Sequence, residues 1–260
     1  MTFFPREHGA TAMLLIPFAS AAVLVGVWHP AEAAVLAAAI CAYRIKEPLL
    51  VLARRRPEGK REARAWVAVL GLVAVAAGGY LAWRGPWRAW AVLSLGAAAF
   101  SLLAIVVNVR NRQRAAWFQV ASAAALTSTC IGLPLAALGD IPGWAWQLWI
   151  LFTLQAAAGI LAVHARLDAR IALRHSQRPP EAPRRKAFFA AGVLGASMFA
   201  FDSRWIDLAV GGAAVCYFLE LLRQRSTRSL ETKLTRIGVE SLLVSLAFAA
   251  TITVGLLARN

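Results

Sequence analysis

The chain alternates between long apolar runs and short polar connections. Runs of about 18 or more apolar residues have the length that a helix needs to cross the hydrocarbon core of a bilayer. A helix also satisfies its own backbone hydrogen bonds, which lipid cannot do. The pattern predicts an all-α polytopic transmembrane bundle of about nine helices, at residues 10–27, 33–53, 65–83, 88–107, 116–137, 144–164, 187–201, 205–222 and 238–257.

Pro48 falls inside the predicted span at residues 33–53. Pro48 removes a backbone donor and crowds the carbonyl of Arg44, so a kink or a helix end is expected there. The first apolar run admits a second interpretation, a signal peptide cleaved near residue 33. Arg6 is the only basic residue before that run, and Glu7 offsets its charge. We therefore interpret the run as a retained helix.

Composition supports a membrane location for the whole chain. The 260 residues are 60% hydrophobic and 16% charged, with a formal net charge of +15. A soluble domain would have to expose much of this apolar sequence, so residues 1–260 are predicted to form a single integral membrane domain with no soluble domain. The basic residues stand in clusters between apolar spans, which is typical of membrane topology and excludes a nucleic-acid partner. The three cysteines lie in apolar runs without metal-ligand spacing, and no metal site is predicted.

The distribution of positive charge predicts the orientation. Of the 28 Lys and Arg residues, 22 fall in one set of alternating loops and four in the other, with Arg44 and Lys46 inside the second span. Short loops rich in positive charge stay in the cytoplasm. The chain is therefore expected to be N-in/C-out in a bacterial inner (cytoplasmic) membrane.

Ionisable residues gather at the predicted cytoplasmic ends of the helices. Such groups are costly near lipid unless they are solvated, paired or functional. The candidate catalytic residues, which could act as bases, proton carriers or orienting partners, are Glu7, His8, Glu47 and Asp168, with Glu240 as a further candidate base. The candidate substrate-binding residues are Arg6, Tyr43, Arg44, Lys46, Asn108, Gln155, His164, Arg166 and Arg170. The competing interpretation is that these residues only set the topology, with long basic side chains that reach the lipid headgroups.

Two stretches resemble a known family. The opening Pro5-Arg6-Glu7-His8-Gly9-Ala10, followed by an apolar run, resembles the YwiC-like family of bacterial membrane proteins. The stretch at residues 163–170, which contains His164, Arg166, Asp168 and Arg170, is similar to a second marked stretch of that family. The resemblance is expected to extend over the whole chain. It implies a class of protein and no particular reaction.

The architecture also resembles that of the UbiA-type prenyltransferases, with nine helices and polar loops after the second and sixth. In those enzymes Asp-rich loops bind a prenyl diphosphate through Mg²⁺, the cofactor that this resemblance implies. Here Arg44, Lys46 and Glu47 stand at the first loop, and Asp168 is alone among arginines at the second. Because Mg²⁺ needs several oxygen ligands, the pattern favours direct binding of an anionic head by Arg and Lys.

Three functions follow from these observations. The leading hypothesis is a UbiA-like enzyme or a lipid-binding protein, with a cytoplasm-facing site for an isoprenoid or phospholipid that has an anionic head. A transporter for a small solute is the second, although no internal repeat is visible. The third is a non-catalytic assembly factor for another membrane complex.

Overall fold

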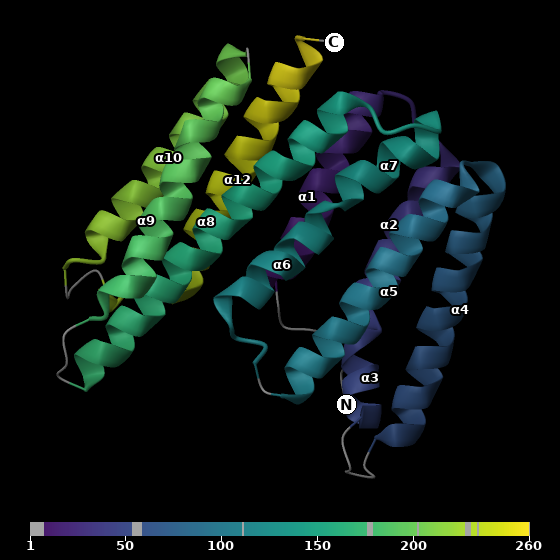
Figure 1. Cartoon of the computed structure of the whole chain (residues 1–260), viewed down its shortest axis with the longest axis horizontal. Coiled ribbons are helices and arrows are strands. Elements are labelled where there is room, and N and C mark those ends of the chain that lie inside the picture. Colours follow the sequence, from purple (N-terminus) through teal and green to yellow (C-terminus); the bar gives the residue numbers. More distant parts are fainter. Residues whose placement is uncertain are drawn as a thin grey trace. The chain divides into compact units, whose positions relative to one another are not determined.

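The structure is a computed structural model that describes residues 8–53, 59–110, 112–175, 179–201, 203–226, 230–232 and 234–259. All the regular structure in these residues is helical (Figure 1). Each of the nine predicted spans coincides with one helix or with two consecutive helices. The prediction of a polytopic helical bundle is therefore confirmed.

The N-terminal unit, Met1–Trp146, is one of two compact units in the chain. Its helices are α1 (His8–Val25), α2 (Pro30–Arg44), α3 (Lys46–Ala53), α4 (Lys60–Arg84), α5 (Trp87–Val109), α6 (Ala116–Thr127) and α7 (Thr129–Leu138). Helix α2 packs against α4 and α7, and α1 packs against α7. A buried apolar cluster holds α2, α4, α5 and α7 together through Ala31, Val35, Leu81, Trp90 and Leu135.

Two predicted spans of this unit are interrupted. The span at 33–53 is divided between α2 and α3 at Ile45, as the position of Pro48 predicts. The span at 116–137 is divided at Ser128, where Thr127, Ser128 and Thr129 each donate a hydroxyl hydrogen bond to the carbonyl three residues earlier. Hydroxyl side chains that bond to nearby carbonyls compete with the helical ladder, which explains the break.

The C-terminal unit, Gln147–Asn260, carries the longest helix. Helix α8 (Gly143–Arg174) begins at the end of the N-terminal unit and continues through this one, followed by α9 (Glu181–Ala196), the short 3₁₀ helix η1 (Ser197–Ala200), α10 (Arg204–Arg223) and α12 (Leu234–Leu257). Helix α10 packs against both α9 and α12.

Small residues let α10 approach its neighbours closely. A Cβ atom added at Gly255 of α12 would lie 2.7 Å from the Cβ of Trp205, which is too close for any real side chain. At Gly195 of α9 it would lie 3.3 Å from the Cβ of Ala214. Close contact at small residues is the usual way in which helices pack in lipid, where there is no hydrophobic drive between them.

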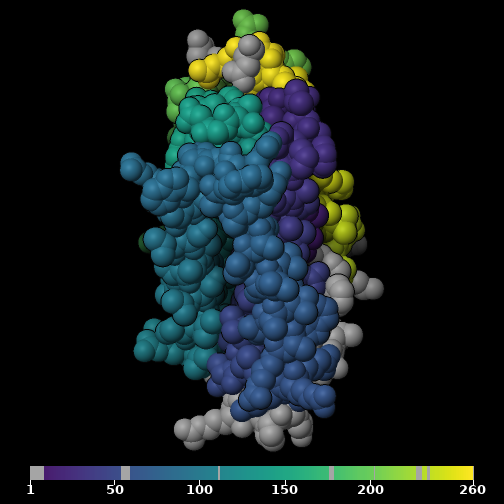
Figure 2. All heavy atoms as spheres, turned by 90° about the vertical axis from the view of Figure 1, so that its right-hand side faces the viewer, coloured from purple at the N-terminus to yellow at the C-terminus, as the bar shows by residue number. Residues whose placement is uncertain are grey.

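Six helices in the described residues are long and apolar enough to cross a membrane: Lys60–Arg84, Trp87–Val109, Ala116–Leu138, Gly143–Arg174, Arg204–Arg223 and Thr235–Leu257. Gly9–Val25 is apolar but shorter. The faces of α4 and α5 are rich in exposed apolar side chains: Leu72 is 71% exposed and Val75 is 73% exposed. Figure 2 shows the molecule from the side on which these two helices lie (blue). Such faces are stable in contact with lipid.

Candidate functional site

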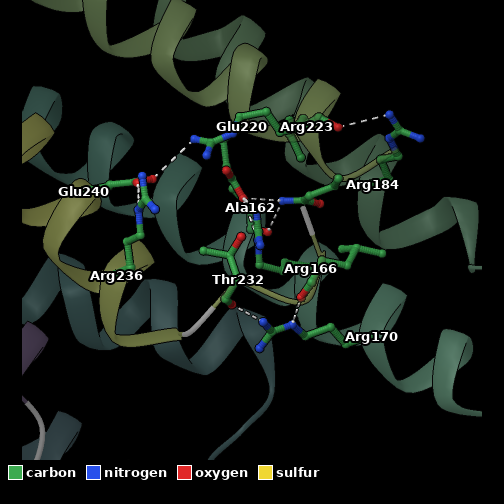
Figure 3. Close-up of polar contacts among 12 residues, drawn as sticks. Ala162, Arg166, Arg170, Arg184, Glu220, Arg223, Thr232, Arg236 and Glu240 are labelled. Carbon is green, nitrogen blue, oxygen red and sulfur yellow. Dashed lines mark hydrogen bonds and ion pairs between the residues drawn. The ribbon is translucent and has the colours of Figure 1, made fainter. Parts of the chain in front are cut away.

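A buried ion pair joins α8 to α10 in the C-terminal unit. The guanidinium of Arg166 donates to Oε1 of Glu220 from both Nε and a terminal nitrogen, each at 2.7 Å (Figure 3). The side chain of Arg166 is 1% exposed and that of Glu220 is 17% exposed. A charge so deeply buried is tolerated only with a partner, so this pair fixes how α8 and α10 meet at this end of the unit.

Gln224 completes this arrangement. Its Nε2 donates to Oε1 of Glu220 and to the carbonyl of Ala162 on α8, both at 3.1 Å. The amide therefore connects the end of α10 to α8 a second time. Glu220 is held by two residues and is oriented rather than free to rotate.

A second, more exposed cluster surrounds Glu240, near the start of α12. Arg236 donates to Oε1 of Glu240 at 3.0 Å from one helical turn earlier, and Arg223 of α10 donates to Oε2 at 3.4 Å. Both arginines are more than half exposed. Exposed pairs contribute little stability, so these guanidinium groups can exchange partners readily.

Two further arginines bind backbone carbonyls at the same end of the unit. Arg170 of α8 donates to the carbonyls of Leu230 and Thr232, which precede α12. Arg184 of α9 donates to the carbonyl of Leu221 at 3.1 Å. The residues labelled in Figure 3 thus include five arginines and two glutamates, so positive charge is in excess here.

A buried polar cluster lies deeper between α8, α10 and α12. The Nε2 of Gln155 donates to the hydroxyl of Tyr217 at 2.7 Å and to the hydroxyl of Ser245 at 2.9 Å. Ser245 donates in turn to the carbonyl of Ser241. A Cβ atom at Gly159 would lie 3.0 Å from the Tyr217 hydroxyl, so the glycine provides the space for this ring.

A cavity of about 280 Å³ lies among these groups. Its polar lining comes from Tyr217, Glu220, Arg223, Glu240 and Ser241, and the remaining lining is Gly159, Ala162, Val163, Cys216, Leu219, Ile237 and Val244. The cavity therefore has charged groups near the ends of α10 and α12 and apolar walls. We call it the α8/α10/α12 cavity. It is suited to a molecule with a charged head and an apolar chain.

The predicted residues of the C-terminal unit are only partly assembled at this site. Gln155, Arg166 and Arg170 belong to the hydrogen-bond network described above. His164 and Asp168 are half-buried on α8 and do not line the α8/α10/α12 cavity.

The remaining predicted residues belong to the N-terminal unit. At the α2–α3 junction the Nζ of Lys46 lies 3.7 Å from a carboxylate oxygen of Glu47 and 5.6 Å from the ring centre of Tyr43, with Arg44 beside them. Asn108 donates to the carbonyl of Ala104 in its own helix. Arg6, Glu7 and the side chain of His8 lie outside the described residues. That the two sets of residues form one site stays a prediction.

Several residues of the network were not among the predicted site residues. Tyr217, Glu220 and Gln224 stand at positions i, i+3 and i+7 of the α10 region and therefore on one helical face. Polar residues at that spacing in an apolar helix are a signal that could have been found. The positions of Arg184 and Arg223 gave no such signal, because basic residues at helix ends are explained by topology alone.

The described residues do not fit a multi-carboxylate Mg²⁺ site. They contain no group of three or more His, Cys, Asp or Glu side chains placed to hold a metal ion. Glu220 and Glu240, the two carboxylates of the α8/α10/α12 cavity, are each bound by arginine. Mg²⁺ prefers several oxygen ligands around it, so a guanidinium rather than a metal neutralises charge at this cavity.

The fold and the apolar helices define a multi-pass integral membrane protein. Residues 4–137 match the sequence model of the YwiC-like protein family, which is more than half of the chain. The chain belongs to the YwiC-like family. No curated protein and no solved structure matches it significantly. The family match ends before α8, so the resemblance of residues 163–170 stays a prediction.

Proposed function

We propose that the protein binds an amphiphile with an anionic head, such as an isoprenoid or phospholipid, in the α8/α10/α12 cavity. The observation that carries this proposal is that Arg223, whose bond to Glu240 is long, lines the cavity beside apolar walls. Guanidinium groups form strong paired hydrogen bonds with phosphate and carboxylate. Small and apolar side chains, among them Ala162 and Val244, give the chain of the ligand an apolar surface.

Arg223 is the cation best placed to exchange partners. Its bond to Glu240 is 3.4 Å long, and Glu240 keeps a shorter bond to Arg236. An anionic head can therefore replace Glu240 at Arg223 without leaving that carboxylate alone. Arg166 donates to Glu220 from Nε and from one terminal nitrogen, so its role is to hold the Glu220 carboxylate in the wall of the cavity.

The size of the cavity limits what enters it. Pockets that enclose whole small molecules usually have volumes of about 300–1,000 Å³. The 280 Å³ here is sufficient for a head and the first part of a chain. The rest of the chain would then extend into the bilayer. The hydroxyls of Tyr217 and Ser241 line the cavity and give hydrogen-bonding groups for an ester or hydroxyl near the head.

A UbiA-like transferase is the finer form of this proposal. In it the arginines would hold a prenyl diphosphate, and Glu220 or Glu240 would orient the acceptor. Formation of a prenylated product by the purified protein would support this form, and binding without turnover would limit the function to lipid binding.

Calorimetric titration of the purified protein with dioctanoyl phosphatidylglycerol and dioctanoyl phosphatidylcholine tests the proposal. We expect tighter binding of the anionic lipid, and a loss of about tenfold in Arg223→Gln because one charge-assisted hydrogen bond is removed. Arg185→Gln is the matched control, since Arg185 is exposed and pairs with Glu181 away from the cavity. Equal affinity for the two lipids, or equal losses in the two variants, would contradict the proposal.

A further inference from the structure

A second cavity lies at the same end of the C-terminal unit and is not part of the proposed amphiphile site. It has a volume of about 330 Å³ and is lined from α8, from the segment before α9, and from the end of α10. Its polar lining in the described residues consists of Arg184, Gln224 and Arg225. We call it the α8/α9 cavity.

The charges around this cavity are unbalanced. Arg184 and Arg225 both line it, and no described residue of its lining is acidic. Burial, together with the like charge of Arg225, lowers the pKa of Arg184. Two guanidinium groups that face one space repel each other unless an anion lies between them.

The hydrogen bonds of Arg184 are also incomplete. One terminal nitrogen donates to the carbonyl of Leu221, and the guanidinium stacks over the ring of Phe188 at 5.5 Å, so the side chain is held in place. Its buried Nε has no hydrogen-bond partner. A buried donor without a partner costs about 1–3 kcal/mol, and more when the group is charged. This side chain is thus pre-positioned but not satisfied.

We propose that the α8/α9 cavity binds a phosphate group through Arg184 and Arg225. A phosphate carries up to two negative charges and several acceptor oxygens, which match the forked donors of two guanidinium groups. Gln224 can reach the phosphate through a bridging water, since its Nε2 already donates to Glu220 and to the carbonyl of Ala162. The phosphate can belong to a lipid phosphomonoester or to a soluble phosphate compound, because both present the same oxygen atoms. This inference does not rest on the amphiphile site.

The position of Gln224 gives the site a further consequence. Its Nε2 holds Glu220 of the amphiphile site while its side chain lines the α8/α9 cavity. A phosphate bound beside Gln224 therefore adjoins the buried Arg166–Glu220 pair. Binding of a phosphate in the α8/α9 cavity is therefore expected to change the affinity of the α8/α10/α12 cavity for an amphiphile, and the reverse is also expected.

The test uses the full-length protein in nanodiscs of phosphatidylcholine. In one arm inorganic phosphate is titrated, and in the other the nanodiscs contain phosphatidic acid. Binding is followed by ³¹P NMR line broadening and by the thermal unfolding midpoint. Response to inorganic phosphate identifies a soluble ligand, and response to phosphatidic acid alone identifies a lipid.

Substitution of single arginines shows whether phosphate binding depends on the α8/α9 cavity or on neighbouring charges. Arg225→Gln changes an exposed residue, so folding is retained, and it should weaken binding about tenfold or more. Arg184→Gln should do the same, and Arg185→Gln should leave binding unchanged. Arg223→Gln, at the amphiphile site, should leave the binding of inorganic phosphate unchanged. The proposal is overturned if neither probe binds, or if Arg225→Gln binds as tightly as Arg185→Gln. It is also overturned if Arg223→Gln removes the binding of inorganic phosphate.

Discussion

Removing the charge of Glu220 should destabilise the C-terminal unit strongly. The substitution Glu220→Gln keeps the size of the side chain but leaves the guanidinium of Arg166, 1% exposed, without its counter-charge. The amide oxygen of glutamine can still accept the two hydrogen bonds of 2.7 Å, so the loss comes from the missing negative charge. Breaking a buried pair by removing one charged partner costs about 3–5 kcal/mol, because it leaves an uncompensated charge in the interior.

Reversible unfolding in mixed detergent micelles measures this loss. Glu181→Gln breaks an exposed pair with Arg185, also at 2.7 Å, and should cost less than about 1 kcal/mol. The double variant Arg166→Met/Glu220→Met should lose much less than the two single variants combined, because neither charge is then left buried alone. Additive losses, or a Glu220→Gln protein as stable as Glu181→Gln, would refute the reasoning.

Three other outcomes follow from the packing and the topology. Gly255→Ala should lower the unfolding free energy by about 1–3 kcal/mol, because the added Cβ would lie 2.7 Å from the Cβ of Trp205. A Cβ at Gly238 of the same helix meets nothing within 4 Å, so Gly238→Ala should be neutral. Chemical or thermal unfolding compares the two variants. Gly159→Ala should weaken binding of phosphatidylglycerol several-fold by displacing the Tyr217 hydroxyl, which titration calorimetry measures, and unchanged affinity would remove Tyr217 from the site. For the predicted orientation, a single cysteine at Glu62 should react only with membrane-permeant maleimide in intact cells, and one at Asp140 should react with an impermeant reagent.

The helices were predictable because their signal is local. An apolar run of sufficient length determines a span wherever it lies in the chain, and each predicted run coincides with helix in the structure. The break before Pro48 was predictable for the same reason, since a proline acts on its own turn. The break at Ser128 was not predicted, because it depends on which backbone carbonyl accepts the hydrogen bond of each of three hydroxyl groups.

Only part of the hydrogen-bond network around the candidate site could be anticipated from the sequence. Gln155, Arg166 and Arg170 were singled out because polar groups in or beside an apolar span are costly unless they are paired, solvated or functional, and their role in binding stays a prediction. Their partners were not assigned, since Glu220 lies 54 positions from Arg166 and meets it only through the packing of α8 on α10. The sequence pattern does not contain that packing. His164 and Asp168 share the helix of Arg166 but do not share its cavity.

Photo-crosslinking with a diazirine-labelled phosphatidylglycerol tests the central claim most directly. Mapping of the labelled peptides should place the crosslinks on α8, α10 and α12 around Gly159, Cys216 and Val244, which line the cavity. Label at these positions should fall in Arg223→Gln and should be weak with the phosphatidylcholine analogue. Label spread over the apolar faces of α4 and α5, equal for both lipids, would contradict a specific site for an anionic amphiphile.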